Sequence, residues 1–515
     1  MRSNWAGAAW PRALVMYAGA AVLATALAAG VPSASAAPDA AAVVMAAGYV
    51  PPPPEDFSGL SWTGAFDALQ RKMSREYAFT RWKGINWPAL GAEYRPRIVA
   101  AQAAGDLDAY YLALREFIHE LPDGHVSIKG FDTAAQTEIA AVEQKLAGGG
   151  FGLIATSLNN GKVIASWVKS GGPAALAGME PGAQLLAWDG RTVTTALART
   201  STVLGPNQPT SWRTRYEQCR YLVRAPVGTA RTVSYRNPAG RARRTACLTA
   251  VDDGLETLIM TDSRSVLKDG WPERTVEHEI LPGNVGYLRL LLELDLPASV
   301  PGDHTPTLTL FRAAIQEFIN AKVSGVIVDI RSNAGGSDKM VTELLGSFYT
   351  RRTFYEYQNY IIPETGAFEI WLGDDDTGEY ASPGQGLWIE PAAVRYAGPV
   401  VALVNNGCIS SGEGMAMGIK NLPNGRVVGF AATNGSFGMV GSAVLMPGNF
   451  EIDWPFGQSL NKRKLVQDDS RHGRGGVTPD SKIPMTLRNA LRVSAGEDVE
   501  LEYGLHVLGT MRQGN

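Results

Sequence analysis

Three cysteines and no surplus of either charge are the first features of this 515-residue chain. Three cysteines allow no more than one disulfide. The 47 Lys and Arg residues against 50 Asp and Glu residues give no basic excess, so no nucleic-acid partner is expected. His, Cys, Asp and Glu residues do not cluster at the spacings of metal ligands, and we predict neither a metal nor another cofactor. The length favours two or three domains over a single core.

Long apolar runs are also scarce, because only one occurs, at residues 13–31. Two arginines precede it and small residues follow it, which is the pattern of a secretory signal peptide. We therefore predict a signal peptide over residues 1–36, cleaved near Ala36, and a mature chain exported to the periplasm or the extracellular space. An uncleaved signal anchor is the alternative. No later run reaches the ~20 residues that span a bilayer, so no stable membrane span is expected in the mature chain.

Export would carry the cysteines into an oxidising compartment. Cys219 and Cys247 fall in the same predicted domain, and we expect them to form a disulfide. Cys408 stands two residues before Ser410 at the end of an apolar strand. We expect it to be a small buried residue, and a nucleophilic role for its thiol is the alternative.

The order of patterns along the chain predicts an α/β multidomain protein. A proline-rich tether leads to a helical region, a glycine-rich β unit follows, and strands and helices then alternate as in a layered α/β sheet. An aromatic stretch inside the last unit is a possible β insertion. The predicted boundaries are 37–59 for the tether, 60–130 for the N-terminal helical domain, 145–255 for the β domain, 275–495 for the α/β domain with the insertion at 349–396, and 496–515 for a C-terminal tail.

The candidate nucleophile lies in the stretch VVALVNNGCISSGE, residues 400–413. Its apolar start predicts a buried parallel strand, and the residues after Ser411 predict a helix. Ser410 would then lie on a strand-to-helix turn, where its hydroxyl is exposed beside the free N–H groups of the helix. The alternative is an ordinary helix cap, in which Ser410 and Glu413 form an S-x-x-E capping box.

A second strand, loop and helix start occurs at residues 325–338. Its loop, R-S-N-A-G-G, ends in paired glycines, so its N–H groups form a plausible second side of an oxyanion hole. A phosphate-binding loop is the alternative, but the G-K-[ST] ending is missing. Earlier in the chain, the turn D-G-H delivers His125 to the start of a strand, and a surface turn residue is the alternative for this histidine.

The glycine-rich unit at residues 148–250 resembles a PDZ domain through its G-P-A-A-L-A-G-M-E-P-G run. A loop whose N–H groups point outward captures a peptide carboxylate while the peptide adds to the sheet edge. We expect Gly150, Phe151 and Gly152 to form this peptide-binding loop. A small β domain with turn glycines is the alternative.

Five stretches in one order resemble the tail-specific (C-terminal processing) serine peptidases and their tricorn-core relatives. They are the helical region ending in L-P-D-G-H, the PDZ-like unit, V-D-I-R-S-N-A-G-G, S-S-G-E and G-G-V-T-P-D. The resemblance implies a helical N-terminal domain, a PDZ-like domain and a catalytic domain with a mixed sheet flanked by helices, of the ClpP/crotonase-like type. It implies a protein or peptide substrate, held at its C-terminus by the PDZ-like domain.

The resemblance also assigns roles. Ser410 matches the family nucleophile, and the Ser411 N–H and Gly336 match the oxyanion hole. Ser436 stands where the tail-specific branch carries its lysine base, and Lys420 lies about three helical turns below the serine, too far to reach back.

The tricorn-like branch uses a histidine from the N-terminal region as base, oriented by a late carboxylate. His125 matches that histidine, and Asp469, ahead of Asp468, is the nearest acid for the orienting role. A histidine of ordinary pKa ~6.5 predicts that activity falls as the pH drops through roughly 6 to 7.

We therefore expect an exported serine peptidase. The main alternative is a catalytically inactive relative that binds peptides or other ligands, which the missing lysine favours. An esterase of the α/β-hydrolase type is the weaker alternative, because the serine turn does not match a complete G-x-S-x-G motif.

Overall fold

The computed structural model describes residues 54–240, 242–262, 271–370 and 386–513. The predicted signal peptide and its cleavage site lie outside the described residues. Within these ranges, every helix is too short or too polar to cross a membrane.

A six-stranded sheet, which we call the catalytic sheet, positions the two predicted loops. Its order is β12-β13-β14-β18-β19-β22, and all neighbours are parallel except β12 and β13. β14 and β18 are adjacent and parallel, so the loops that follow them emerge at the same edge. Its strands are β12 (Val276–Leu281), β13 (Val285–Leu290), β14 (Val326–Asp329), β18 (Val400–Leu403), β19 (Gly425–Gly429) and β22 (Ser481–Lys482).

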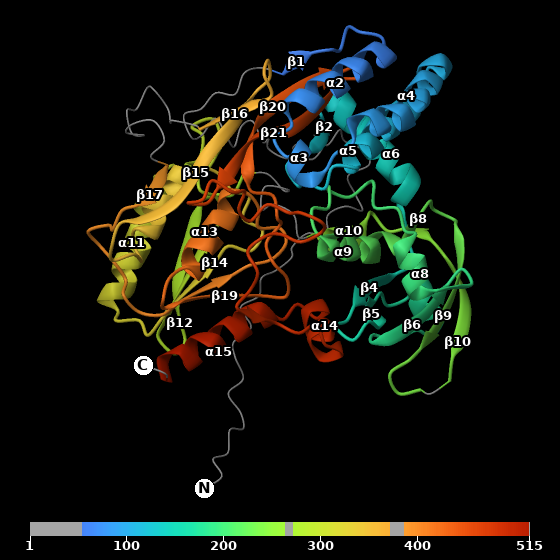
Figure 1. Ribbon diagram of the computed structural model, residues 1–515. Coiled ribbons are helices and arrows are strands. Elements are labelled where there is room, and N and C mark those ends of the chain that lie inside the picture. Colours follow the sequence, from blue (N-terminus) through green and yellow to red (C-terminus); the bar gives the residue numbers. More distant parts are fainter. Residues whose placement is uncertain (1–53, 241, 263–270, 371–385, 514–515) are drawn as a thin grey trace. The chain divides into compact units, whose positions relative to one another are not determined.

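Helices cover both faces of the catalytic sheet, which explains why its strands are apolar throughout. Val400 and Ala402 of β18 pack with residues of α11, α12 and α13, while Val401 and Leu403 pack on the other face with α15. Figure 1 shows α13 and α15 on opposite sides of the strands. The helices are α11 (Thr307–Asn320), α12 (Asp338–Leu345), α13 (Ser411–Lys420) and α15 (Val499–Gln513). The helix before α15, α14 (Leu487–Ser494), packs instead against residues 163–168 of the β domain.

The segment predicted as a C-terminal tail is therefore part of the core. Val499 and Leu508 of α15 are 1% exposed and lie against the catalytic sheet. The prediction of a tail at 496–515 was wrong, because the polar residues of this helix conceal an apolar face that repeats at helical spacing.

A second sheet of seven strands joins the N-terminal helices to the rest of the chain. Its central order is β1-β20-β21-β15-β16, with β17 on β15 and β2 on β21. Buried residues of α2, α4 and α5 share one core with β20 and β21, and these elements lie together in Figure 1. The strands are β1 (Glu55–Asp56), β2 (Ser127–Gly130), β15 (Thr353–Ile362), β16 (Ala367–Ile370), β17 (Leu387–Ile389), β20 (Gly438–Met446) and β21 (Phe450–Leu460), and the helices are α2 (Trp62–Glu76), α3 (Thr80–Lys83), α4 (Trp87–Ala104), α5 (Leu107–His119) and α6 (Thr133–Ala147).

The possible β insertion at 349–396 does form strands, β15 to β17, and they belong to this second sheet. Residues 371–385 of that stretch lie outside the described residues. The end of the predicted tether is also ordered, because β1 pairs with β20.

The remaining strands form the β domain, which has its own core around Phe151, Leu185 and Val233. Its main sheet has the order β10-β9-β6-β5-β4, which leaves β4 at an edge. The elements are β3 (Gly149–Gly150), β4 (Leu153–Ser157), β5 (Val163–Val168), α7 (Pro173–Leu176), β6 (Ala183–Trp188), β7 (Arg191–Thr192), α8 (Val193–Ala198), α9 (Ser211–Leu222), β8 (Arg224–Ala225), β9 (Ala230–Arg236), β10 (Arg244–Thr249), β11 (Val251–Asp252) and α10 (Glu256–Met260).

The predicted disulfide is not formed. Cys219 and Cys247 are both free cysteines, as is Cys408. Cys219 points from α9 into the core of the β domain, with its Sγ 3.6 Å from the Ser157 Oγ, whereas Cys247 is exposed on β10. The pairing prediction was wrong, because membership of one domain does not place two side chains on the same side of its sheet.

We expect alkylation to separate the three thiols. Cys247 should react with iodoacetamide in the native protein, while Cys219 and Cys408 should react only after unfolding, since burial raises the pKa of both thiols and blocks access. Peptide mapping without reduction measures the result. A peptide that links Cys219 to Cys247 would contradict the free-thiol structure.

Candidate active site

Ser410 occupies a strained turn between β18 and α13. Its φ of 58° and ψ of −132° lie in a region that non-glycine residues rarely adopt, at a cost of about 1–3 kcal/mol. Its side chain makes no capping hydrogen bond, although Ser410 stands at the N-cap position of α13. The alternative of an ordinary capping serine is therefore wrong, and the half-buried hydroxyl of Ser410 is not committed to the helix.

Glu413, the other residue of the alternative capping box, contacts the loop at residues 433–436. The Glu413 carboxylate accepts hydrogen bonds from the Thr433 hydroxyl at 2.6 Å, the Gly435 N–H at 2.7 Å and the Ser436 N–H at 2.9 Å. Burial raises the pKa of Glu413 to about 8, although these donors oppose the shift. Glu413 thus holds the loop at residues 433–436 against the nucleophile helix.

The N-A-G-G loop after β14 packs directly on the serine turn. A side chain at Gly335 would come within 2.6 Å of the Ser410 Cβ, so only glycine fits there. The Ser411 hydroxyl donates to the Gly336 carbonyl at 2.9 Å. In the described part of the chain, neither the Gly336 N–H nor the Ser411 N–H has an acceptor. Two free backbone donors beside a serine are what an oxyanion hole requires.

Asn333 fixes the shape of this loop, although no sequence pattern singled it out. Its side-chain amide donates to the Leu290 carbonyl at 3.0 Å and to the Glu293 carboxylate at 2.8 Å, while its oxygen accepts from the Gly335 N–H at 2.7 Å. Burial raises the pKa of Glu293 to about 8. Glu293 is therefore protonated at neutral pH, which keeps a negative charge away from the free N–H groups.

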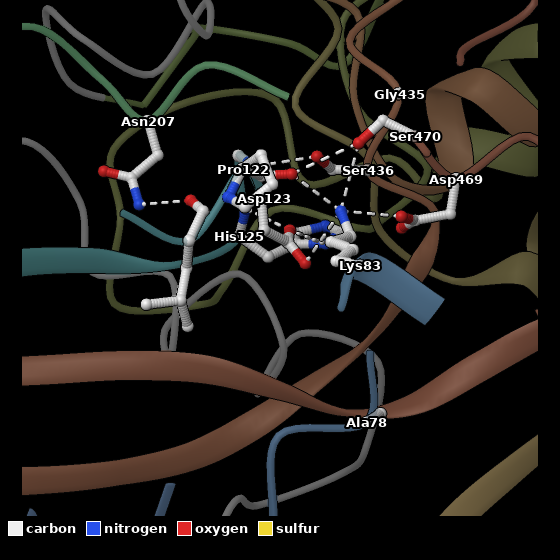
Figure 2. A network of polar contacts seen from close by, with 12 residues as sticks. Ala78, Lys83, Pro122, Asp123, His125, Asn207, Gly435, Ser436, Asp469 and Ser470 are labelled. Atoms are coloured by element: carbon white, nitrogen blue, oxygen red, sulfur yellow. Dashed lines mark hydrogen bonds and ion pairs between the residues drawn. The ribbon is translucent and has the colours of Figure 1, made fainter. Parts of the chain in front are cut away.

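The D-G-H turn lies against the serine turn, and one residue joins them. The Ser436 hydroxyl accepts from the Gly124 N–H at 2.7 Å, and the Ser436 carbonyl accepts from the Ser410 N–H at 3.2 Å. A side chain at Gly124 would come within 3.0 Å of the Ile409 Cδ1. Figure 2 shows Ser436 beside the turn that carries His125.

His125 is placed by the elements on either side of it. The Asn207 amide binds the Ile118 and Leu121 carbonyls at the end of α5, at 2.7 and 3.0 Å, and β2 begins two residues after His125 and pairs with β21. Its side chain is 8% exposed, and among the residues that the structure describes neither ring nitrogen has a hydrogen-bond partner. Burial lowers the pKa of His125 to about 4, an effect that Asp123 opposes and Lys83 increases. The imidazole is therefore neutral and free to accept a proton at neutral pH.

Asp469 does not take the predicted orienting position. It forms an ion pair with Lys83 at 2.7 Å and accepts from the Phe437 N–H at 3.0 Å, and it makes no hydrogen bond to His125. The carboxylate that faces the imidazole is Asp123, whose Oδ1 lies 3.8 Å from the His125 Nδ1. The prediction was wrong because a buried lysine, distant in sequence, attracts the Asp469 charge.

Two lysines, Lys420 and Lys83, form ion pairs with carboxylates. Lys420 pairs with Asp480 at 3.2 Å and donates to the Thr478 carbonyl, away from Ser410. Lys83 was not predicted, because nothing in the helical pattern around it marks a functional residue. It is buried beside Asp123 and Asp469.

The predicted peptide-binding loop is part of the β domain. Phe151 is fully buried against Trp188, and Gly150 pairs with both β8 and β11. Gly152 has a φ of 70° and starts the turn into the edge strand β4. A cavity of about 700 Å³ lies along β4, between α9 and the loops of the catalytic sheet, and its lining includes Ile154, Tyr216, Arg331 and Asn405. In the described ranges, no group of three or more His, Cys, Asp or Glu side chains is arranged to hold a metal ion.

Two family models match the chain. The model of peptidase family S41 matches residues 285–483, which contain the catalytic sheet from β13 to β22 and Ser410. The model of the tricorn protease C1 domain matches residues 59–109 in the N-terminal helices. No curated protein sequence matches the chain.

Solved structures share the fold. Mature CPAF superimposes with a TM-score of 0.60 at 16% identity, over 88% of this chain and 98% of that chain. Mature CPAF complexed with lactacystin gives a TM-score of 0.57 at 16% identity, over 88% of this chain and 99% of that chain. Identity this low shows the common fold and does not transfer individual residues.

The family match and the fold together define the class of this protein, which is a serine-type peptidase. Within that class, the chain resembles peptidase family S41, the tail-specific peptidases, over residues 285–483. Over residues 59–109 it resembles the C1 domain of tricorn protease. The resemblance drawn from five sequence stretches is confirmed.

Proposed function

We propose that this chain is an exported serine peptidase in which Ser410 is the nucleophile and His125 is the general base. The observation that carries the proposal is Ser436, which binds the backbone of both turns. This contact links the strained turn of Ser410, whose hydroxyl makes no capping hydrogen bond, to the turn that carries the buried His125. The link supports the proposal, because a serine needs a neighbouring base to attack an amide.

The proposed reaction follows from these positions. The Ser410 hydroxyl attacks the carbonyl carbon of the scissile peptide bond as its proton passes to the His125 imidazole. The oxyanion that forms is stabilised by the Gly336 and Ser411 N–H groups. The protonated imidazole, which Asp123 stabilises from 3.8 Å, then gives its proton to the leaving amine. Water, activated by His125, hydrolyses the acyl-enzyme.

The substrate is proposed to be a protein or peptide that binds along β4. β4 is an edge strand, so an extended peptide can add to its sheet, with α9 as the second wall of the cavity. The cavity continues to Arg331 and Asn405, in the loops that follow β14 and β18. A C-terminus held by the loop at Gly150, Phe151 and Gly152 would direct the chain ahead of it towards Ser410. Export rests on the signal-peptide pattern alone.

Fluorophosphonate labelling tests the proposed function, because only an activated serine reacts. The mature chain is expected to gain a single adduct, and tandem mass spectrometry should map it to Ser410. A heat-unfolded sample is the control for nonspecific reaction. If the native chain gains no adduct, the peptidase proposal fails, and an inactive relative that binds peptides in the β4 cavity becomes the better description.

A further inference from the structure

Lys83 is a deeply buried charge beside the candidate active site that the proposed reaction does not use. It is the last residue of the short helix α3, which ends at Gly84 in a left-handed conformation. Its side chain is 1% exposed. Lysine is rarely buried to this degree unless it is paired, so its partners indicate its role.

The partners of Lys83 come from two segments that are far apart in sequence. The ammonium donates to the Pro122 carbonyl at 2.8 Å and pairs with Asp123 at 3.4 Å, both in the turn that leads to His125. It also pairs with Asp469 at 2.7 Å and donates to the Ser470 hydroxyl at 3.1 Å. Figure 2 shows these contacts converging on one nitrogen.

The two oxygens of the Asp123 carboxylate contact different residues. Its Oδ2 faces Lys83 and accepts from the Tyr77 hydroxyl at 2.8 Å. Its Oδ1 accepts from the backbone N–H of His125 at 3.0 Å and lies 3.8 Å from the ring Nδ1. The contacts of Oδ2 with Lys83 and Tyr77 therefore fix the orientation of Oδ1 relative to the imidazole.

We propose that Lys83 is a positioning residue of this active site, which orients the Asp123 carboxylate towards His125 by binding it together with Asp469. The proposal rests on the proposed role of His125 as base. Lys83 is not itself a base, because it stays protonated. Burial alone would lower its pKa, but Asp123 and Asp469 more than offset this and hold the pKa above its ordinary value. The N-terminal helices thus supply part of the catalytic machinery.

Lys83→Met should slow catalysis without weakening substrate binding. Asp123 and Asp469 would lose their common cation and repel each other, so Asp123 would no longer be held against His125. We expect kcat to fall by at least about tenfold, less than the roughly 10²- to 10⁴-fold that a general base contributes, while KM changes little. Lys129→Met is the matched control, since Lys129 also bridges two carboxylates, Glu451 and Asp453, between β2 and β21.

A second pair of variants separates positioning from folding. Lys83→Met leaves two buried carboxylates without a cation and can destabilise the fold. Asp469→Asn keeps the Lys83 to Asp123 pair, and Lys83→Met/Asp469→Asn removes the cation without leaving two opposed charges. The double variant should be slower than Asp469→Asn by at least about tenfold in kcat. Equal rates in the two folded variants would overturn the proposal.

The ring of His125 gives a readout that does not depend on activity. Two charged groups act on the ring, Asp123 in its own turn and Lys83 from α3. Asp469 contacts Lys83, and Tyr77 contacts Asp123. In Lys83→Met we expect the His125 pKa to fall, because Asp123, which raises this pKa more than Lys83 lowers it, would turn away from the ring. NMR titration of histidine ring carbons in a Ser410→Ala background measures the shift. A His125 pKa that rises, as loss of the Lys83 charge with Asp123 still in place would cause, or that stays unchanged, overturns the proposal. If the wild type takes no fluorophosphonate label yet the His125 pKa falls, the proposed function fails while the positioning contact stands.

Discussion

Replacing Ser410 by alanine is expected to abolish fluorophosphonate labelling and to lower peptidase kcat by roughly 10⁴- to 10⁶-fold. The fold should survive, because the change removes a hydroxyl that makes no capping hydrogen bond. The turn stays held by Gly335, which packs on it, and by the Ser436 carbonyl, which accepts from the Ser410 N–H that alanine keeps. Circular dichroism melting of the variant, beside the labelling assay, measures both expectations.

Ser411→Ala is the matched control for Ser410→Ala. The Ser411 hydroxyl donates to the Gly336 carbonyl, and the proposed oxyanion donor is the Ser411 N–H, which alanine keeps. We expect labelling to persist, with a moderate loss of rate because one contact to the N-A-G-G loop is removed. Labelling that survives in Ser410→Ala and disappears in Ser411→Ala would show that the nucleophile is the neighbouring serine.

The sequence predicted those parts of the site that local patterns determine. The apolar runs of β14 and β18 are long enough to read as buried strands, and the loops after parallel neighbours meet at one edge. The paired glycines Gly335 and Gly336 predicted a loop beside the serine turn, and a side chain at Gly335 would indeed clash with the Ser410 Cβ. The match to peptidase family S41 over residues 285–483 agrees with that interpretation.

The sequence did not predict contacts that depend on tertiary packing. Asp469 pairs with Lys83, which is far from it in sequence. No local pattern links the short helix that carries Lys83 to the late loop that carries Asp469. Ser436 was noted only as a position where a lysine is missing, whereas its backbone and hydroxyl join the two turns. Side-chain direction explains the disulfide error in the same way, since Cys219 is buried in the core of the β domain and Cys247 is exposed.

The histidine base should give an activity profile that differs from that of an exposed histidine. A general base must be neutral to accept the serine proton, so activity follows the unprotonated fraction of His125. An ordinary pKa predicts a decline between pH 7 and 6. Burial lowers the His125 pKa to about 4, so the structure predicts that kcat/KM stays high through pH 6 and declines only near pH 4. Rates of fluorophosphonate labelling between pH 3.5 and 8 measure this decline, the acid limb of the pH–rate profile, without a peptide substrate.

Unfolding in acid would also lower the activity, so it must be measured separately from the protonation of His125. His119 and His125 are both buried with pKa values of about 4, below the ordinary value of ~6.5 in the unfolded chain. Their contribution to stability is therefore present above pH ~6.5 and is lost as the pH falls towards 4. Circular dichroism at each pH identifies the range in which the protein stays folded, and only rates from that range enter the profile.

His125→Gln should lower kcat/KM by roughly 10²- to 10⁴-fold and remove the acid limb, because glutamine does not titrate in this range. His119→Gln is the matched control. His119 is also buried with a low pKa, but it contacts Thr202 and Gln208 rather than the serine turn. That variant should keep both the rate and the limb. A wild-type decline between pH 7 and 6 in folded protein would mean that His125 is more exposed to water than the structure shows. Full activity of His125→Gln would mean that another group accepts the Ser410 proton.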